Sequence, residues 1–267
     1  MPLSSLQQRI ITSLLLIATL AAALIMRGKV LTGALTVFCI IAMHEFYGMF
    51  WQDKANRIAR YMGMCAGAGI VMTSALVSPV WMLLTLIGAF WLFNFRFLIS
   101  FSARGDLASY RDSLILFAGV VYIPVTLQFI NSMTSLEIFF VLLSSSASDT
   151  VAFYTGTFFG KKKIWPQISP KKSWAGSIGG FLGCIICCTV YGLLLGDASI
   201  TEWLILGAAL NIAAQMGDFF ESALKRKLQI KDSGKILPGH GGVLDRIDSL
   251  VLALPVYVLA KQIHAYF

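Results

Sequence analysis

The chain has 267 residues, of which 57% are hydrophobic and 13% are charged, and its formal net charge is +8. So few polar residues could not cover the surface of a soluble domain of this length, which excludes that class. The mean hydropathy of +0.77 indicates an integral membrane protein instead.

Apolar segments of roughly 20 residues recur along the whole chain, and each can cross a hydrocarbon core of about 30 Å as an α-helix. We therefore predict an all-α, polytopic membrane protein with about nine transmembrane helices. Pro79 separates the third span from the fourth, because proline resists helical continuation. The expected spans are 10–26, 30–50, 61–78, 80–101, 113–130, 136–159, 175–195, 200–220 and 249–267.

Basic residues predict the orientation of these spans, since cytoplasmic loops are rich in Lys and Arg. Arg27, Lys29 and Lys261 fall on one side, and Arg96 lies within a span. The opposite side receives 17 basic residues, namely Arg9, Lys54, Arg57, Arg60, Arg104, Arg111, Lys161, Lys162, Lys163, Lys171, Lys172, Lys225, Arg226, Lys227, Lys231, Lys235 and Arg246. The N-terminus is therefore expected in the cytoplasm, within a multi-pass protein of the cell (inner or plasma) membrane.

Polar residues are distributed unevenly along the chain. Residues 1–135 hold few ionisable groups inside their spans, so this part is expected to be a transmembrane scaffold. Residues 136–267 are expected to form the catalytic region with its cytoplasmic loops. The pair His44-Glu45, near the end of the second span, is interpreted as an interfacial anchor rather than a catalytic pair.

Asp149 lies in the sixth span within a run of small polar residues, 144–150. A charged carboxylate at the centre of a membrane helix costs about 2.5 to 3.5 kcal/mol, so Asp149 should face a polar cavity or a partner. A helix-packing stripe of small residues is the alternative, and it explains the serines better than the aspartate.

Two basic clusters follow this span. The first, 161–163, is typical of a cytoplasmic anchor. The second, Ser169-Pro170-Lys171-Lys172-Ser173, combines a proline turn and two cations with the start of a helix, whose backbone N–H groups favour anions. It predicts a phosphate site, with a simple interface loop as the alternative.

Polar side chains recur at helical spacing near the end of the eighth span. Asp218, Glu221, Ser222 and Lys225 occur at i, i+3, i+4 and i+7, which places two carboxylates, a hydroxyl and an ammonium on one helix face. Such a face needs water or a ligand. Ordinary ion pairs on a cytoplasmic extension of the helix are the alternative explanation.

Residues 231–248 combine a glycine-rich loop with carboxylates. Glycines after Pro238 would allow close approach of a phosphate, and a helix is expected to begin near Val243. Asp245 and Asp248 would then lie one turn apart on one helix face and could bind a hard cation through oxygen. The alternative is that the two carboxylates only stabilise the start of this helix, where negative charge interacts favourably with the helix dipole.

These stretches resemble the signature of the phosphatidate cytidylyltransferases, or CDP-diacylglycerol synthases. The signature residues are Ser222-Ala223-Leu224-Lys225-Arg226, Lys231-Asp232-Ser233-Gly234 and Leu237-Pro238-Gly239-His240-Gly241-Gly242-Val243-Leu244-Asp245-Arg246-Ile247-Asp248. The motif 169–174 resembles another block of that family, and Asp149 its preceding aspartate. Ser173 stands where the family often has Thr, and Ala175 where it often has Glu, so position 175 is given no catalytic role.

The resemblance implies metal-assisted attack by a phosphate oxygen of phosphatidic acid on the α-phosphorus of CTP, giving CDP-diacylglycerol and diphosphate at the cytoplasmic membrane face. Mg²⁺ is the expected cofactor, with room for a second cation. The expected catalytic residues are Asp218, Lys225, Asp245 and Asp248, and the expected metal ligands are Asp149, Asp218, Asp245 and Asp248. The expected substrate-binding residues are Ser169, Lys171, Lys172, Ser173, Ser222, Arg226, Lys231, Asp232, His240, Gly241, Gly242 and Arg246.

The residues by themselves leave other functions open. His240 is either a phosphate donor or a simple loop residue. A CTP-dependent lipid kinase, or a cytidylyltransferase for another phospholipid, would use similar groups. An ion-coupled transporter would also place carboxylates in the membrane, although no inverted repeat supports it. A homodimer is expected from family likeness alone, and no nucleic-acid partner is expected.

Overall fold

The computed structural model describes residues 5–51 and 56–267, with the side chains of residues 5, 6, 8, 9 and 79 left aside. Within these residues the regular structure is helical, apart from two isolated β-bridges. The chain divides into two compact units. The first unit contains residues 1–132 and 232–245, and the second contains 133–231 and 246–267.

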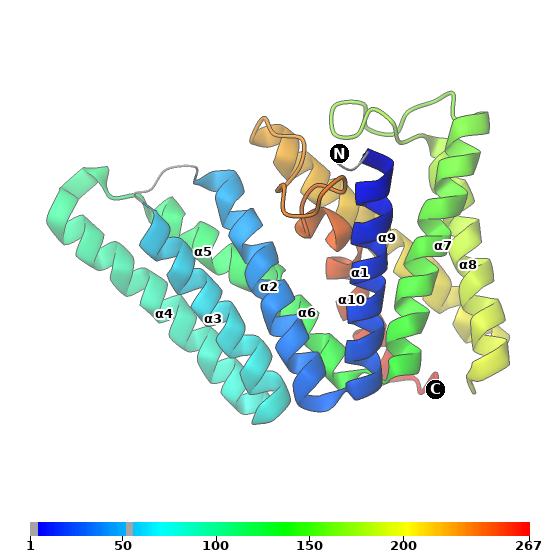
Figure 1. Cartoon of the computed structure of the whole chain (residues 1–267), viewed down its shortest axis with the longest axis horizontal. Helices are drawn as coiled ribbons and strands as arrows, with labels where there is room; N and C mark the ends of the chain where they lie inside the picture. The colour runs from blue at the N-terminus through cyan, green and yellow to red at the C-terminus, as the bar shows by residue number, and fades with distance from the viewer. Residues whose placement is uncertain (1–4, 52–55) are drawn as a thin grey trace. The chain divides into compact units, whose positions relative to one another are not determined.

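The helices of the first unit pack in chain order (Figure 1), α2 against α3 and α3 against α4. Its centre is Tyr47, which is fully buried and donates a 2.8 Å hydrogen bond to the carbonyl oxygen of Leu116. Gly63 and Gly119 face the Tyr47 ring, where a β-carbon would collide with it. The elements are α1 (Ser5–Met26), α2 (Gly28–Phe50), α3 (Arg57–Leu76), α4 (Pro79–Arg104), η1 (Gly105–Leu107), α5 (Tyr110–Tyr122), α6 (Pro124–Leu127) and η2 (Gln128–Ser132).

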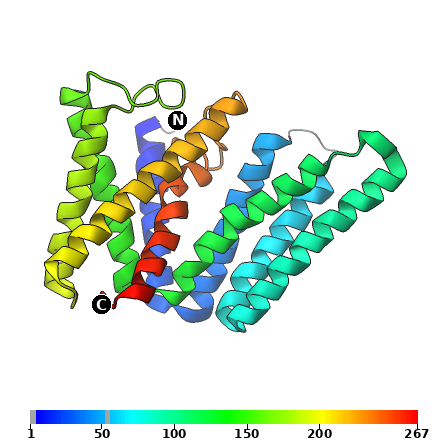
Figure 2. The same cartoon turned by 180° about the vertical axis from the view of Figure 1, so that it is seen from behind.

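The second unit is a helix bundle of α7 (Ser135–Phe159), α8 (Trp174–Leu195), α9 (Ile200–Lys227) and α10 (Asp248–Ile263), with α9 packed against both α8 and α10 (Figure 2). Small residues allow α7 and α8 to approach closely. A β-carbon at Gly176 would lie 2.9 Å from the Ala152 carbonyl oxygen, and one at Gly180 3.0 Å from that of Ser148. Such contacts are typical of membrane helices, where close packing drives association.

Local sequence signals explain where the helices of this bundle begin. Thr134 and Glu137 form a capping box at α7, and Ser199 and Glu202 form one at α9. Ser173 caps α8 by accepting a hydrogen bond from the Gly176 N–H. These helices therefore start at positions set by short polar side chains.

The predicted helical class is confirmed, whereas the count of nine spans is not. Six helical segments of the described chain are long and apolar enough to cross a membrane, which makes this a multi-pass membrane protein. They are Gly28–Phe50, Val80–Leu107, Tyr110–Ser132, Ser135–Phe159, Trp174–Leu195 and Ile200–Lys227. The apolar part of α1 is shorter, and the 16 residues of α10 extend only about 24 Å at 1.5 Å per residue. Glycines and two arginines lower the hydropathy of α3.

The fifth span, expected over 113–130, falls within the apolar segment Tyr110–Ser132, inside which Pro124 separates α5 from α6 because proline has no N–H for the helical ladder. One further expectation needs correction. The last helix begins at Asp248 rather than near Val243, and Asp245 lies in a preceding 3₁₀ turn, η3 (Leu244–Arg246). Asp245 and Asp248 therefore do not share the first turn of one helix. Lys54, counted in the orientation argument, lies outside the described residues.

Candidate functional site

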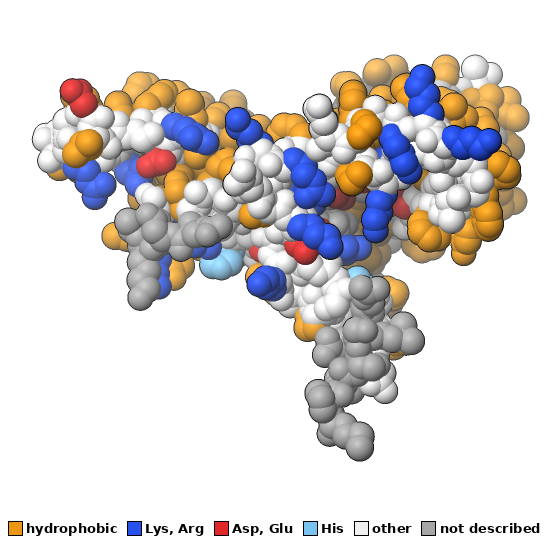
Figure 3. Space-filling view, turned by 90° about the horizontal axis from the view of Figure 1, so that it is seen from above, with side chains coloured by type: hydrophobic (Ala, Val, Ile, Leu, Met, Phe, Trp, Pro, Cys, Tyr) orange, Lys and Arg blue, Asp and Glu red, His pale blue; other side chains and the backbone are white. Residues whose placement is uncertain are grey.

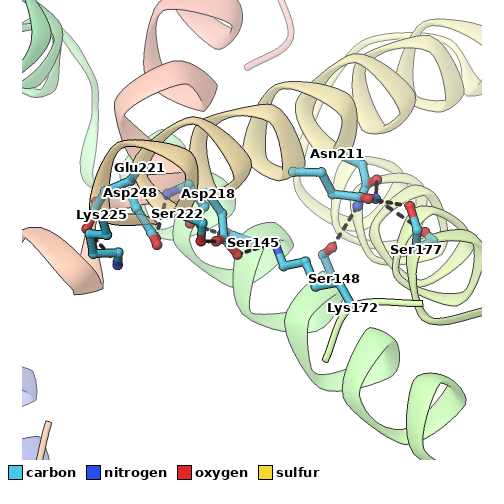
Figure 4. Close-up of polar contacts among 12 residues, drawn as sticks. Ser145, Ser148, Lys172, Ser177, Asn211, Asp218, Glu221, Ser222, Lys225 and Asp248 are labelled. Carbon is cyan, nitrogen blue, oxygen red and sulfur yellow. Dashed lines mark hydrogen bonds and ion pairs between the residues drawn. The ribbon is translucent and has the colours of Figure 1, made fainter. Parts of the chain in front are cut away.

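Polar side chains form a continuous stripe along α9 in the second unit (Figure 4). Asp218 accepts a 3.2 Å hydrogen bond from the Ser222 hydroxyl, as the helical spacing predicts. The stripe also extends further into the bundle than predicted. Asn211 is fully buried and donates to the Ser148 hydroxyl at 2.6 Å, and Gln215 bonds both Asn211 and Ser177. The α9 stripe therefore connects α7 and α8 through hydrogen bonds.

Lys172 brings a cation to this stripe from the loop before α8. Its ammonium forms an ion pair with Asp218 and lies 4.3 Å from the centre of the Phe219 ring. Both partners stay partly accessible, with 31% and 28% of their side chains exposed. The structure thus joins two residues that are 46 positions apart in the sequence.

Lys225 pairs with Glu221 one turn further along α9. The ammonium lies 3.0 Å from Oε1 of Glu221, and the glutamate side chain is completely buried while that of lysine is 10% exposed. A buried charge of either sign would be costly without such a partner. The pair holds the Lys225 ammonium in a fixed position at the end of the stripe.

Asp248 lies close to Asp218 because α9 and α10 approach tightly at Gly217. A β-carbon at Gly217 would collide with the Asp248 backbone, so only glycine permits this approach. Burial, and then the nearby Asp218 carboxylate, raise the pKa of the Asp248 carboxyl to about 7. The Ser249 N–H and the charges of Lys225 and Lys172 act in the opposite direction. Two adjacent carboxylates thus form an electrostatically unfavourable pair that a cation would relieve.

The pair Asp218 and Asp248 fits the chemistry of a magnesium site. Within residues 5–51 and 56–267, no three His, Cys, Asp or Glu side chains are grouped to hold a metal ion. Mg²⁺ commonly uses one or two carboxylates, with water and substrate phosphates as its other ligands. Asp149 is on α7 and is exposed there, so its role as a ligand stays a prediction.

The loop between α7 and α8, residues 160–173, is closed by backbone bonds. Trp174 N–H donates to Lys162 at 3.0 Å, and Ile164 N–H donates to Lys172 at 3.3 Å. The Ser173 hydroxyl, a predicted substrate contact, is buried and serves as the helix cap. Lys171 is exposed. The loop therefore holds Lys172 close to α9 by its own backbone structure.

The segment 232–245 of the first unit forms a second closed loop, here called the signature loop. The Asp245 carboxylate accepts hydrogen bonds from the Ser233 N–H at 3.0 Å and from the Gly242 N–H at 2.9 Å. Gly239 and Gly241 have φ values of +75° and +84°, which glycine adopts without strain. Asp245, predicted as a metal ligand, thus also fixes the shape of its own loop.

Helix α1 contacts the tip of the signature loop. Thr12 donates to the Pro238 carbonyl at 3.2 Å, and the Ser13 hydroxyl lies 3.3 Å from Nε2 of His240. His240 is therefore held by contacts more than 200 positions away in the sequence. No local pattern in the sequence could have indicated this pairing.

Glu45 contacts the signature loop, which the sequence interpretation did not anticipate. Its side chain is buried, and Oε2 accepts a 2.9 Å hydrogen bond from the Leu244 N–H of the signature loop. The expectation of an interfacial anchor is therefore wrong for Glu45. His44 is exposed, and its carbonyl oxygen accepts a 3.2 Å hydrogen bond from Arg60. A carboxylate five residues before the end of an apolar helix was the only available signal.

The remaining predicted contacts lie on loop and helix-end surfaces of the two units. Arg226 is exposed, and it donates to the carbonyl oxygens of Ile168 and Ile230 at 3.3 and 3.2 Å. Figure 3 shows the loop-bearing face, on which Lys and Arg side chains are numerous, with apolar side chains around it. The other exposed residues of this group are Lys231, Asp232 and Arg246.

The fold and the polar stripe together define a multi-pass membrane protein with paired carboxylates and lysines in a helix bundle. Comparison with known proteins gives the family. The model of the cytidylyltransferase family matches residues 7–264, and the chain belongs to this family.

Three relatives named phosphatidate cytidylyltransferase show the extent of the similarity. The protein of Staphylococcus aureus is 30% identical over 255 residues, which cover 93% of this chain and 96% of the relative. That of Thermotoga maritima is 47% identical over 128 residues, covering 45% of this chain and 47% of the relative. That of Haemophilus influenzae is 42% identical over 123 residues, covering 44% and 43%. The last two matches thus span about half the length of those relatives.

Proposed function

We propose that the chain is a phosphatidate cytidylyltransferase, which joins CTP and phosphatidic acid into CDP-diacylglycerol and diphosphate. The observation that carries this proposal is that an accessible ion pair, Lys172 of the loop before α8 with Asp218 of α9, lies beside a second carboxylate, Asp248 of α10. Membership of the cytidylyltransferase family and the name shared by its relatives support the same chemistry.

In the proposed reaction, a phosphate oxygen of phosphatidic acid attacks the α-phosphorus of CTP. The new bond joins that oxygen to the α-phosphorus, and the bond to the β-phosphate bridging oxygen breaks as diphosphate leaves. The lipid phosphate is already ionised near neutral pH, so no general base is required. Such transfers depend mainly on positioning and on neutralising charge as it develops.

The lysines can perform the positioning. The Lys172 ammonium is accessible, so it can turn from Asp218 toward a phosphate oxygen that competes for it. Lys225 is held by Glu221 and contributes a fixed positive charge to the same helix. His240 and the backbone of the signature loop, both in the first unit, are also proposed to contact phosphate.

Mg²⁺, held by Asp218 and Asp248 and proposed also to involve Asp149 of the same unit, would neutralise negative charge on the phosphate oxygens. The metal role expected of Asp245, in the first unit, stays a prediction. Without a cation, burial and then the neighbouring Asp218 charge both disfavour an ionised Asp248, and they raise its pKa. A second cation and a homodimeric assembly belong to the same proposal.

We also propose that the loops carrying this site face the cytoplasm of a cell membrane. Eleven of the 17 basic residues counted above fall between positions 161 and 246, in these loops and at the adjoining end of α9. The anionic inner leaflet and soluble CTP are found on the cytoplasmic side.

Purified protein incubated with labelled CTP and phosphatidic acid in Mg²⁺-containing micelles tests the proposed function. Lipid-linked CMP together with released diphosphate is the expected result. Phosphorylated lipid would identify a lipid kinase instead. If neither product forms, both enzyme functions are rejected and ion-coupled transport is favoured. Ion uptake into proteoliposomes would then measure that transport.

A further inference from the structure

The strongest feature outside the proposed chemistry is Glu45, a carboxylate of α2 buried against the signature loop. Glu45 is only 3% exposed, and it lies between the buried apolar residues Met43 and Phe46 of α2. A buried carboxylate is costly unless it makes hydrogen bonds. Glu45 makes one to the backbone of Leu244, the residue directly before Asp245.

Two glycines of the signature loop adapt it to this carboxylate. The three atoms nearest to a β-carbon built at Gly234 all belong to Glu45, and its Cγ would be only 2.7 Å away. A β-carbon at Gly242 would lie 2.7 Å from Glu45 Oε2. Neither glycine has a positive φ, so steric space rather than backbone conformation excludes a larger residue.

Glu45 and Asp245 thus hold the loop through different backbone N–H groups. Asp245 binds the N–H groups of Ser233 and Gly242 from within the loop, while Glu45 binds that of Leu244 from α2. A loop that must present its backbone to a phosphate gains from being ordered in advance, because less conformational entropy is then lost on binding.

We propose that Glu45 is a positioning residue for cytidylyl transfer: it fixes the signature loop, and with it the orientation of Asp245, without contacting substrate. This inference rests on the function proposed above. It assigns a role in the reaction to the N-terminal part of the chain, which the sequence indicated only as a scaffold.

A double-mutant cycle between Glu45 and Gly234 tests this proposal. The variants are Glu45→Ala, Gly234→Ala and their combination, with Glu45→Gln as the conservative change. Gly33→Ala is the matched control, because a β-carbon at Gly33 in α2 would meet nothing within 4 Å. The measurements are kcat and KM, the melting temperature in detergent, and the mobility of a spin label at Lys235→Cys, an exposed loop position.

Gly234→Ala alone should lower kcat by at least about tenfold and increase label mobility, since small displacements at an active site are costly. In the Glu45→Ala background the same change should alter kcat by less than about threefold, because the clashing side chain is gone. Glu45→Gln, whose amide oxygen can still accept from Leu244, should keep most of the activity, the wild-type melting temperature and an immobile label.

Equal effects of Gly234→Ala in both backgrounds would overturn the proposal, as would unchanged kcat and label mobility in Glu45→Ala. If Glu45→Ala does not fold, Glu45→Gln and Gly234→Ala still decide between the outcomes: the proposal requires Gly234→Ala to mobilise the label and Glu45→Gln not to. If the wild-type protein transfers no CMP, the proposed function fails separately, and the label measurements alone judge whether Glu45 holds the loop.

Discussion

Lys172 forms an ion pair with Asp218, so the residue before the cap of α8 is connected to the polar stripe of α9. The two side chains are about one third exposed or less, at 31% and 28%. An ion pair this accessible contributes little to stability, since water screens it. In the proposed function, a phosphate would compete for the ammonium of this pair and Mg²⁺ for its carboxylate.

Substitutions at Lys172 should separate phosphate binding from simple anchoring. Lys172→Arg should lower kcat/KM for CTP or lipid, because a planar guanidinium does not replace a compact ammonium. Lys172→Ala should cost about 2 kcal/mol or more, the loss of one charge-assisted contact. Lys171 is expected to show the same order of effects. Lys162→Ala, in the exposed anchor cluster, is the control and should keep normal kinetics.

Carboxylate-to-amide changes should abolish turnover in a folded protein. Asp218→Asn, Asp245→Asn and Asp248→Asn keep the side-chain shape but remove the negative charge that a cation requires. Activity assays alongside size-exclusion profiles measure both effects. Asp106→Asn, at an exposed position of η1, should change neither. Near-normal rates in any two of the site variants would reject the metal assignment.

Magnesium activation should depend on pH through Asp248. Its pKa is raised to about 7, so below that pH a proton occupies the carboxyl and competes with the cation. The apparent affinity for Mg²⁺ should therefore fall by up to about tenfold per unit as the pH drops from 7 to 5. It should level off above about pH 8. Magnesium titrations of activity measure this, and EDTA should abolish turnover reversibly. An affinity independent of pH would contradict the role of Asp248.

Accessibility labelling tests the proposed orientation. In a cysteine-free background, cysteines at Lys162 and Lys235 should react with an impermeant reagent only from the cytoplasmic side. A cysteine at Asp197 should react only from outside. All three positions are exposed, and none is a helix cap. Reaction of Lys162→Cys and Asp197→Cys from the same side would reject the predicted topology.

Much of the site was readable in the sequence because its parts are local. Asp218 and Ser222 are four residues apart on one helix, so their hydrogen bond follows from helical geometry. Ser173 at the start of α8 was likewise visible, although its hydroxyl serves as a cap. The start of α10 was misplaced by five residues, because the turn at η3 delays the helix until Asp248.

The sequence by itself determined the class of protein, the helical content and the family signature, because hydropathy and motif spacing depend on neighbouring residues. Only the tertiary structure decided that Lys172 meets Asp218, that Gly217 lets α10 bring Asp248 close, and that Glu45 supports the signature loop. Glu45 and Leu244 are 199 positions apart. Contacts over such separations depend on how helices pack, and an apolar helix with one carboxylate does not indicate which distant backbone N–H that carboxylate will bind.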